Sequence, residues 1–248
     1  MPYTGYHSGM SSLSPIAARP ENLTEQVFQR IQESIVDQTL APGTRVSEAS
    51  IAALLDVSKT PVREALLRLR YIGLVEQTGT GRLRVIDPSS KEVRDAYEFR
   101  AMIERSAAYE AAGRISTVAA DQLLEYAQDT VIMAKAQTGK GYRDTDRRFH
   151  LAVATATTNG VLHEAVGNAL VLTSALRERE VPMAEEFLAC ATEHVGIAEL
   201  VATGNQAAAA DAMNAHVLHV MAQVLQTRSP STAAAQPARE ALGVRVRR

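Results

Sequence analysis

The sequence predicts a mainly α-helical protein of two parts, in which three helices and a β-hairpin precede an all-α antiparallel helical bundle. Three observations support this fold class. Alanine is abundant, whereas aromatic residues make up only 4% of the chain and Trp is absent, a composition that suits helices better than sheets. Apolar residues recur at helical spacing through most of the 248 residues. Asp87 and Pro88 break the chain between the two parts.

The first helix is expected over residues 23–40. Val27, Ile31 and Ile35 fall on one face of it, and Pro42 stops it. Ser47 is then placed to cap a short second helix, EASIAALLDV.

The third helix begins in the stretch VSKTPVREALLRLRYIGLV, residues 57–75. Either Ser58 or Thr60 can cap this helix, and Pro61 falls in the first turn, where its missing amide donor is not needed. The helical repeat then predicts a buried stripe that consists of Val62, Leu66 and Leu69. After the helix, apolar residues at 74–75 and 83–86 flank a glycine-rich turn at 79–81, which predicts a small β-hairpin.

Basic residues are concentrated in this region. Residues 58–86 hold six Lys or Arg and two Glu, a net charge of +4 in a chain whose formal net charge is −2. Cations and small hydroxyl side chains at a helix N-terminus suit the major groove and the phosphates of DNA, and Arg82 in the hairpin turn could reach the DNA backbone or the minor groove. The charges alone also fit an ordinary solvated helix face. The short preceding helix and the following hairpin favour a winged helix-turn-helix over residues 21–87.

The segment from Gly43 to Val85 resembles the DNA-binding domain of GntR-family bacterial regulators. The family signature resembles VSRTPVREAL…L…GL…..GRG..V, and this chain has VSKTPVREALLRLRYIGLVEQTGTGRLRV. Two departures are Lys59, where the family usually has Arg, and Ala49, where it often has Arg. The resemblance implies that double-stranded operator DNA is contacted by Ser58, Lys59, Thr60, Arg63, Gly81 and Arg82.

The second part, residues 91–226, is expected to be entirely helical. Gly113, the glycines at 139 and 141, Asn159-Gly160, Pro182 and Gly204 separate its segments. The six expected helices cover residues 91–113, 117–138, 142–157, 161–178, 183–203 and 206–226.

Asp146 and His150 lie four residues apart, so they share a helix face and can converge on one ion. His194 and His216 lie in the fifth and sixth helical segments. Spacing alone leaves two interpretations open, a shared metal site and three unrelated half-buried histidines. Two further histidines, His163 and His219, are expected at the surface.

Residues 91–226 resemble the FCD ligand domain of the FadR-type GntR subfamily, whose metal-binding members carry an Asp-x-x-x-His pair and two later histidines. The resemblance implies a divalent transition metal held by Asp146, His150, His194 and His216. Three imidazoles and one carboxylate suit zinc best, with nickel or manganese as alternatives. A six-coordinate ion would keep two positions for water or for a ligand carboxylate.

Arg100 and Glu104 project from the middle of the apolar stripe of helix 91–113. Burying charges is costly unless they are paired or meet a ligand, so two interpretations stand. One is a structural ion pair between residues four apart. The other is an effector-binding site in which Arg100 clamps a carboxylate beside the metal, in agreement with the small organic acids that similar domains bind.

We therefore expect a transcriptional regulator, by default a repressor, that binds a short palindromic operator as a homodimer and responds to a small organic acid. Two rivals are a metal-dependent hydrolase or lyase with Glu193 or Glu104 as general base, and a constitutive DNA binder with a structural metal. The winged-helix segment argues against an enzyme, which has no need of it.

The ends of the chain complete these expectations. Residues 1–20, rich in Ser, Gly and Pro, are predicted to form a disordered tail. Residues 227–248, rich in Pro and Ala and basic at the end, are predicted to form a flexible one. Cys190 is the only cysteine, which excludes an internal disulfide and fits a reducing compartment. No apolar run approaches the roughly 20 residues of a membrane helix, and the N-terminus has no signal-peptide core. A cytoplasmic protein without a membrane partner is expected.

Overall fold

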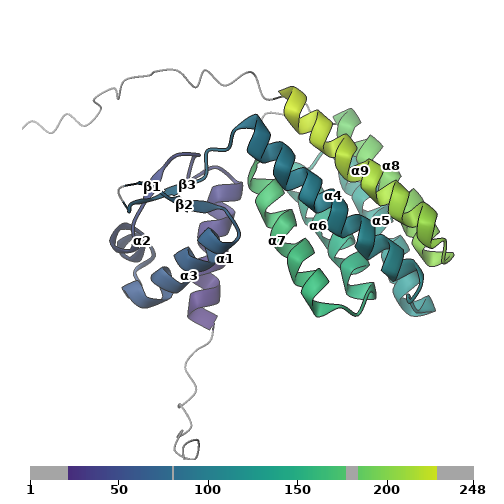
Figure 1. Ribbon diagram of the computed structural model, residues 1–248, viewed down its shortest axis with the longest axis horizontal. Helices are drawn as coiled ribbons and strands as arrows, with labels where there is room; N and C mark the ends of the chain where they lie inside the picture. The colour runs from purple at the N-terminus through teal and green to yellow at the C-terminus, as the bar shows by residue number, and fades with distance from the viewer. Residues whose placement is uncertain (1–21, 80, 177–183, 228–248) are drawn as a thin grey trace, which may run out of the picture.

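The computed structural model describes residues 22–79, 81–176 and 184–227 of the chain. They form a small N-terminal unit of helices and a sheet, followed by a larger bundle of helices (Figure 1). The expected tails lie outside the described residues, apart from Thr227 at the end of the last helix.

The N-terminal unit contains the expected three helices and hairpin, and the mainly α fold class is confirmed. Helix α1 ends at Val36, four residues before the expected end. A strand that the sequence did not predict, β1, pairs with β3, so the sheet has the order β1-β3-β2 with antiparallel neighbours. With two residues, β1 is too short to show any alternation in the sequence. The elements are α1 Asn22–Val36, β1 Arg45–Val46, α2 Glu48–Leu55, α3 Lys59–Tyr71, β2 Val75–Gln77 and β3 Leu83–Val85.

The core of this unit lies between α1, α3 and the sheet. The apolar faces expected for α1 and α3 are buried together, and none of their key side chains is more than 3% exposed. Burying a side chain of this size contributes about 1.5–3 kcal/mol, so the packing fixes the direction of α3. The side chains are Val27, Ile31, Ile35, Val62, Leu66 and Leu69.

Two helix starts differ in how they are capped. The Ser47 hydroxyl accepts a hydrogen bond from the Ser50 amide at 3.0 Å, and the Ser50 side chain returns a bond to the Ser47 backbone, as expected for a capped α2. The side-chain cap expected at Ser58 or Thr60 is wrong. Ser58 occupies the N-cap position of α3 with an extended backbone, but its hydroxyl makes no capping bond. That hydroxyl is therefore left for a partner outside the described residues.

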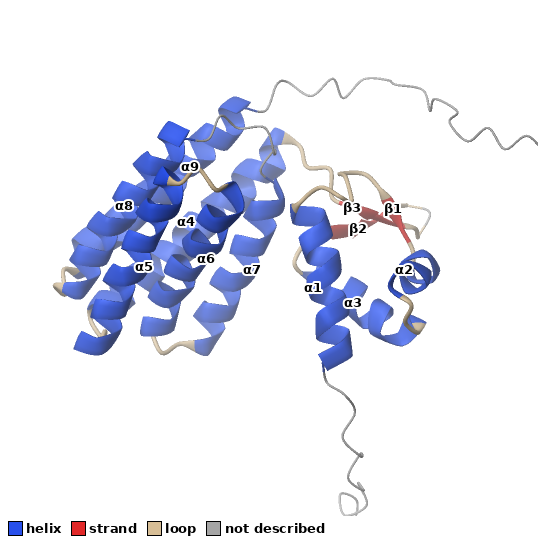
Figure 2. Ribbon diagram, turned by 180° about the vertical axis from the view of Figure 1, so that it is seen from behind, coloured by secondary structure: helices blue, strands red, loops and turns tan. Residues whose placement is uncertain are grey.

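All six helices expected in the second part are present among the described residues, and they form a bundle (Figure 2). The expected break at Pro182 and the expected helix ends at 177–178 and 183 lie outside the described residues. Helix α4 packs against α9, α7 and α6, while α5 packs against α8 and α6. None of the described helices is both long enough and apolar enough to cross a membrane. The helices are α4 Ser90–Ala112, α5 Thr117–Lys135, α6 Gly139–Ala156, α7 Gly160–Leu176, α8 Ala184–Ala202 and α9 Gln206–Thr227.

Helix α7 belongs to the bundle and also packs on the N-terminal unit. Val171 is only 5% exposed and lies in the apolar core of that unit, with Leu172 and Ala175 packed beside it. Leu172 faces Gly73, whose φ of +83° favours glycine and whose missing side chain leaves room for the leucine. In Figure 1, α7 stands between the N-terminal unit and the rest of the bundle. A movement of α7 would therefore be transmitted to both parts.

Candidate nucleic-acid interface and metal centre

The first turn of α3 presents polar side chains without partners. Ser58, Lys59 and Thr60 are exposed and make no hydrogen bond or ion pair with the described residues. The amides of the first turn of a helix also lack partners within the helix. The start of α3 therefore offers a cation, two hydroxyls and helix amides together, as expected for contact with DNA phosphates and bases.

Arg63, expected to contact DNA as well, is engaged within the protein. Its Nε and Nη2 each donate to one carboxylate oxygen of Glu48 at 2.9 Å, which ties α3 to the start of α2. This hydrogen-bonded pair lowers the pKa of Glu48 and raises the pKa of Arg63, and both groups remain solvent-exposed. The other guanidinium donors of Arg63 are not used by Glu48, and they are the ones available to a nucleic acid.

The remaining cations of residues 45–85 divide into two groups. Several are held inside the unit by acidic or polar partners: Arg68 by Glu25 at 2.6 Å, Arg84 by Glu76 at 2.7 Å and Arg70 by Gln77 at 2.9 Å. Arg68 also stacks 3.9 Å from the centre of the Phe28 ring. The side chains of three others make no hydrogen bond or ion pair within the described part of the chain: Arg45, Lys59 and Arg82. The second group is free to meet an anion.

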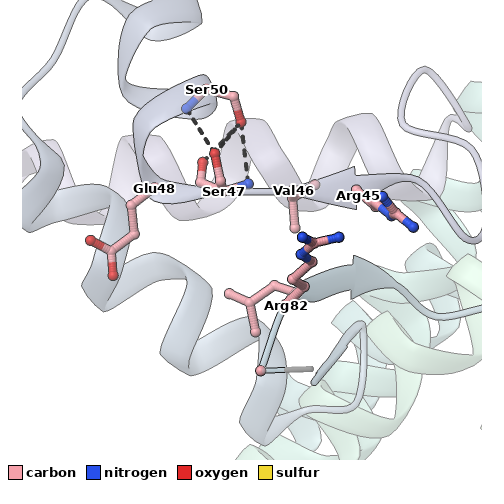
Figure 3. Close-up of a pocket in the computed structure, with 8 residues that line it drawn as sticks. Arg45, Val46, Ser47, Glu48, Ser50 and Arg82 are labelled. Atoms are coloured by element: carbon pink, nitrogen blue, oxygen red, sulfur yellow. Dashed lines mark hydrogen bonds between the residues drawn. The ribbon is translucent and has the colours of Figure 1, made fainter. Parts of the chain in front are cut away.

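Arg45 and Arg82 border one solvent-open pocket between β1, the start of α2 and the β2–β3 turn (Figure 3). In this view the Glu48 carboxylate points away from both arginines. Gly81 in the turn has a φ of +76°, a conformation that favours glycine. The pocket thus combines two unpaired guanidinium groups, a suitable setting for a backbone phosphate. The sequence did not predict Arg45, because only the pairing of β1 with β3 places it beside the wing.

In the bundle, the predicted metal ligands are brought together from three helices. His150 on α6, His194 on α8 and His216 on α9 are each no more than 2% exposed. The Nε2 atoms of His194 and His216 lie 3.1 Å apart. Asp146 places Oδ1 at 3.9 Å from Nε2 of His150 and 3.7 Å from Nε2 of His194. His163 is exposed, as expected.

The other ring nitrogen of each histidine has a partner of its own. Nδ1 of His216 lies 2.7 Å from a carboxylate oxygen, and Nδ1 of His194 lies 3.2 Å from a hydroxyl. That hydroxyl donates its own hydrogen to the Ala127 carbonyl, so it must accept from the histidine. The partners are Glu104 for His150, Thr130 for His194 and Glu193 for His216. Each Nδ1 therefore carries the proton, and each Nε2 keeps a lone pair. The lone pairs of His194 and His216 face each other, whereas that of His150 accepts from Nη2 of Arg100.

This arrangement fits a divalent cation. Burial lowers the pKa of His216 more than its hydrogen bond to Glu193 raises it, so the ring is neutral. The lone pairs of His194 and His216 face each other at 3.1 Å beside the carboxylate of Asp146, an arrangement that repels itself unless a positive ion lies between them. Three neutral imidazoles and one carboxylate are a donor set that zinc accepts, with their outer nitrogens fixed by a second layer of residues.

Arg100 and Glu104 form a buried ion pair beside this centre. Nε of Arg100 donates to Oε1 of Glu104 at 2.5 Å, and Nη2 of Arg100 lies 3.0 Å from Nε2 of His150. Burial by itself would raise the pKa of Glu104, but Arg100 and His150 together lower that pKa to about 2. The carboxylate is thus ionised with both oxygens engaged, whereas Arg100 borders the histidine cluster directly.

The sequence did not predict the supporting contacts of Glu193, His219 and Thr130. Glu193 was considered only as a general base, but its two oxygens hold His216 and His219 at 2.7 and 2.8 Å. His219, expected at the surface, is half-exposed and also bonded to that carboxylate. Thr130 gave no signal, because a threonine in a helix is an ordinary residue until the fold places a ring nitrogen beside it.

A winged helix-turn-helix with a free cation at the start of α3 and two more beside the wing, joined to a helical domain with a polar buried centre, is typical of two-domain DNA-binding regulators. The chain belongs to the gntR family of bacterial regulatory proteins. The profile of that family matches residues 23–85, and the profile of the FCD domain matches residues 95–219, just over half of the 248 residues. The gntR profile describes bacterial regulatory proteins.

Individual relatives are regulators as well. The Uxu operon transcriptional regulator of Escherichia coli K12 is 31% identical over 162 residues, which are 56% of this chain and 60% of the relative. The Nta operon transcriptional regulator of Aminobacter aminovorans is 34% identical over 131 residues, 50% of this chain and 59% of the relative. The transcriptional repressor RspR of E. coli K12 is 28% identical over 128 residues, 52% and 56% of the two chains. The chain thus spans less than two thirds of the length of these curated relatives.

Solved structures share the fold. McbR/YncC of E. coli superposes with a TM-score of 0.71 at 19% identity, covering 82% of this chain and 97% of the other. A GntR transcriptional regulator from Rhodococcus sp. RHA1 gives 0.67 at 23% identity, covering 84% and 100%.

Proposed function

We propose that the chain is a transcriptional repressor whose affinity for operator DNA is controlled by a small carboxylate bound beside a divalent transition metal in the helical domain. The observation that carries this proposal is the convergence of three histidine Nε2 atoms next to Asp146 and the buried Arg100. Repression is supported by the similarity to RspR, which is a transcriptional repressor.

On the DNA side, the start of α3 lies in the major groove, where Ser58, Lys59 and Thr60 meet phosphates and base edges. Glu48 orients Arg63, which contacts DNA through the guanidinium donors that Glu48 does not use. The wing at Gly81 and Arg82 follows the backbone. A homodimer places two such units on a palindromic operator, with half-sites about one helical turn apart.

In the helical domain, Asp146 and the three histidines hold the metal, for which zinc is favoured over nickel or manganese. When bound, the ion supplies a positive centre that attracts an anionic oxygen. Arg100 lies beside that centre and binds the carboxylate of the acid. Glu104 keeps Arg100 charged and orients His150 through Nδ1, so we assign it to the support of the site and not to direct contact with the acid.

The acid acts on DNA binding through α7. Arg100 lies 3.4 Å from the Thr173 hydroxyl of that helix, and the same helix packs on the N-terminal unit through Val171 and Leu172. Binding that favours one position of α7 shifts the population of the dimer toward one arrangement of its two DNA-binding units. Release of DNA is the expected direction.

The proposal is tested by selecting a duplex from a random DNA library with metal-loaded protein and then measuring affinity by fluorescence anisotropy. A panel of small mono-, di- and hydroxycarboxylic acids is added with and without a chelator. We expect at least one acid to weaken binding to the selected duplex, and chelation to abolish that effect.

Two outcomes would favour the competing interpretations. If chelation unfolds the helical domain and no acid in the panel changes DNA affinity, the metal is structural and the chain is a constitutive DNA binder. If no duplex is enriched over scrambled DNA, the DNA-binding part of the proposal is wrong.

A further inference from the structure

A second set of metal-type donors lies one layer outside the histidine centre, between α8 and α9. The ligand atoms of Cys190, Glu193 and His219 all lie within 4.8 Å of one another. Cys190 and Glu193 are three residues apart on α8, so they share a face, and His219 approaches from α9. Cys190 is 4% exposed, whereas the Glu193 and His219 side chains are 36% and 40% exposed. The cluster is therefore closed on the sulfur side and open to solvent on the other.

We propose that Cys190, Glu193 and His219 form a second cation site for a thiophilic divalent metal of the zinc class, separate from the site of Asp146 and the three histidines. Thiolate, imidazole and carboxylate are the three protein donors that zinc uses, and a fourth position would remain for water. The site goes beyond the proposed function, which uses none of the three residues as a metal ligand.

The hydrogen bonds around the cluster allow the donors to be released together. Gln223 Nε2 lies 3.0 Å from Nε2 of His219, and Gln223 Oε1 lies 3.7 Å from the Cys190 sulfur. With Nδ1 of His219 bonded to Oε1 of Glu193 at 2.8 Å, the ring proton sits on Nδ1 and the amide donates to Nε2. Reversing the Gln223 amide reverses both of its bonds, so that it accepts from a proton on Nε2 and donates to the sulfur. That change frees Nδ1 for an ion.

Proton balance follows from this change. The imidazole loses the proton on Nδ1 and gains one on Nε2 by exchange with solvent, so its proton count is unchanged. The ion replaces the thiol proton of Cys190, which is released to solvent. Oε2 of Glu193 is not required by the ion and can keep its 2.7 Å bond to Nδ1 of His216. The two sites are thus neighbours that share one supporting carboxylate but no metal ligand.

The test uses cobalt(II) added to the full-length, thiol-reduced and metal-free chain. A cysteine thiolate bound to cobalt gives a sulfur-to-metal charge-transfer band in the near ultraviolet, which nitrogen and oxygen ligands do not give. Because Cys190 is the only cysteine of the chain, such a band reports this cluster alone. We expect two equivalents of cobalt to bind and the band to grow with one of them.

Variants separate the two sites. Cys190→Ser and His219→Gln should each lose the band and one equivalent, while His163→Gln, an exposed histidine of α7, should change neither. His194→Ala should lose the other equivalent and keep the band, so a failure of the histidine centre is distinguished from a failure of this site. A wild-type chain without the band overturns the proposal, and so does a band that persists in His219→Gln.

Discussion

Val171 and Thr173 lie two positions apart on α7 and contact different parts of the protein. The Val171 side chain is buried in the core formed by α1, α3 and the sheet, whereas the Thr173 hydroxyl lies 3.4 Å from Nη1 of Arg100 beside the histidine centre. Residues two apart point to opposite sides of a helix. One turn of α7 therefore connects the proposed effector site to the DNA-binding unit.

Thr173→Val should uncouple the two sites without disturbing either. The substitution keeps the shape but removes the hydroxyl that Arg100 approaches, so we expect the acid-induced change in DNA affinity to fall by about fivefold or more, roughly 1 kcal/mol of coupling free energy. DNA affinity without acid should stay the same. The Thr173 hydroxyl also donates to the Ala169 carbonyl, four residues earlier. The matched control is therefore Thr155→Val, which removes an exposed hydroxyl that donates in the same way to the Leu151 carbonyl. Anisotropy titrations with and without acid measure the DNA affinity of each variant and its response to acid. An equal loss of the acid response in the two variants would contradict the role of Thr173.

Arg45→Ala should weaken binding to every duplex to a similar degree, because a phosphate contact carries no sequence information. The slope of log affinity against log salt should become less steep by about 1. Arg68→Ala is the control, since Arg68 is already held by Glu25 and Phe28. An unchanged salt slope in Arg45→Ala would remove the pocket of Figure 3 from the interface.

Glu48→Gln should change the sequence specificity of DNA binding more than the affinity for the selected operator. Loss of the carboxylate removes a negative charge from the proposed DNA-binding surface and frees Arg63, so affinity for scrambled duplexes should rise several-fold as the nonspecific electrostatic contribution increases. Discrimination of the selected operator should fall, because Arg63 is no longer oriented. Glu64→Gln, on the same helix but bonded to Thr24 of α1, should leave the ratio of affinities unchanged. A Glu48→Gln variant that keeps full discrimination would show that Arg63 does not need its partner.

His194→Ala should lower the amount of metal that co-purifies with the protein, measured by atomic spectroscopy on dialysed samples. The ring supplies one of the four donors of the proposed centre, and losing a ligand weakens metal binding strongly. His163→Ala, which removes an exposed ring on α7, should retain the wild-type content. Wild-type zinc content in His194→Ala would break the four-ligand assignment.

Glu104→Gln should lower the free energy of unfolding by about 3 kcal/mol, because it leaves Arg100 charged and buried without its counter-ion. Glu110→Gln is a close control. Glu110 also pairs with an arginine four residues away on the chain, at 2.6 Å, but both side chains are exposed. That pair contributes at most about 1 kcal/mol. Urea unfolding of the metal-free variants measures both free energies of unfolding. An equal decrease in the two variants would show that the burial of Glu104 does not add to its contribution to stability.

Most of the helical architecture could be predicted from the sequence, because helical periodicity and helix-ending residues are local signals. The buried stripe of α3 and the six helices of the bundle follow from spacing and from glycine and proline punctuation. Strand β1 could not be predicted, since a two-residue strand exists only through its partner β3. The expected hydroxyl cap of α3 failed for a similar reason, because residue type allows a capping bond but the backbone geometry decides whether it forms.

The sequence by itself determined which chemistry the protein carries: a basic winged-helix segment, an Asp–His pair on one helix face, and a buried Arg–Glu pair on another. Only the tertiary structure decided how these groups meet. His194 and His216 lie 22 residues apart in the chain and Arg100 lies 50 residues before His150, so their contacts depend on how α4, α6, α8 and α9 pack. Tertiary packing also decides whether each arginine is paired within the protein or free. Local periodicity fixes which face of a helix is buried, but the partner of a long polar side chain is set by non-local packing, which no pattern along the chain contains.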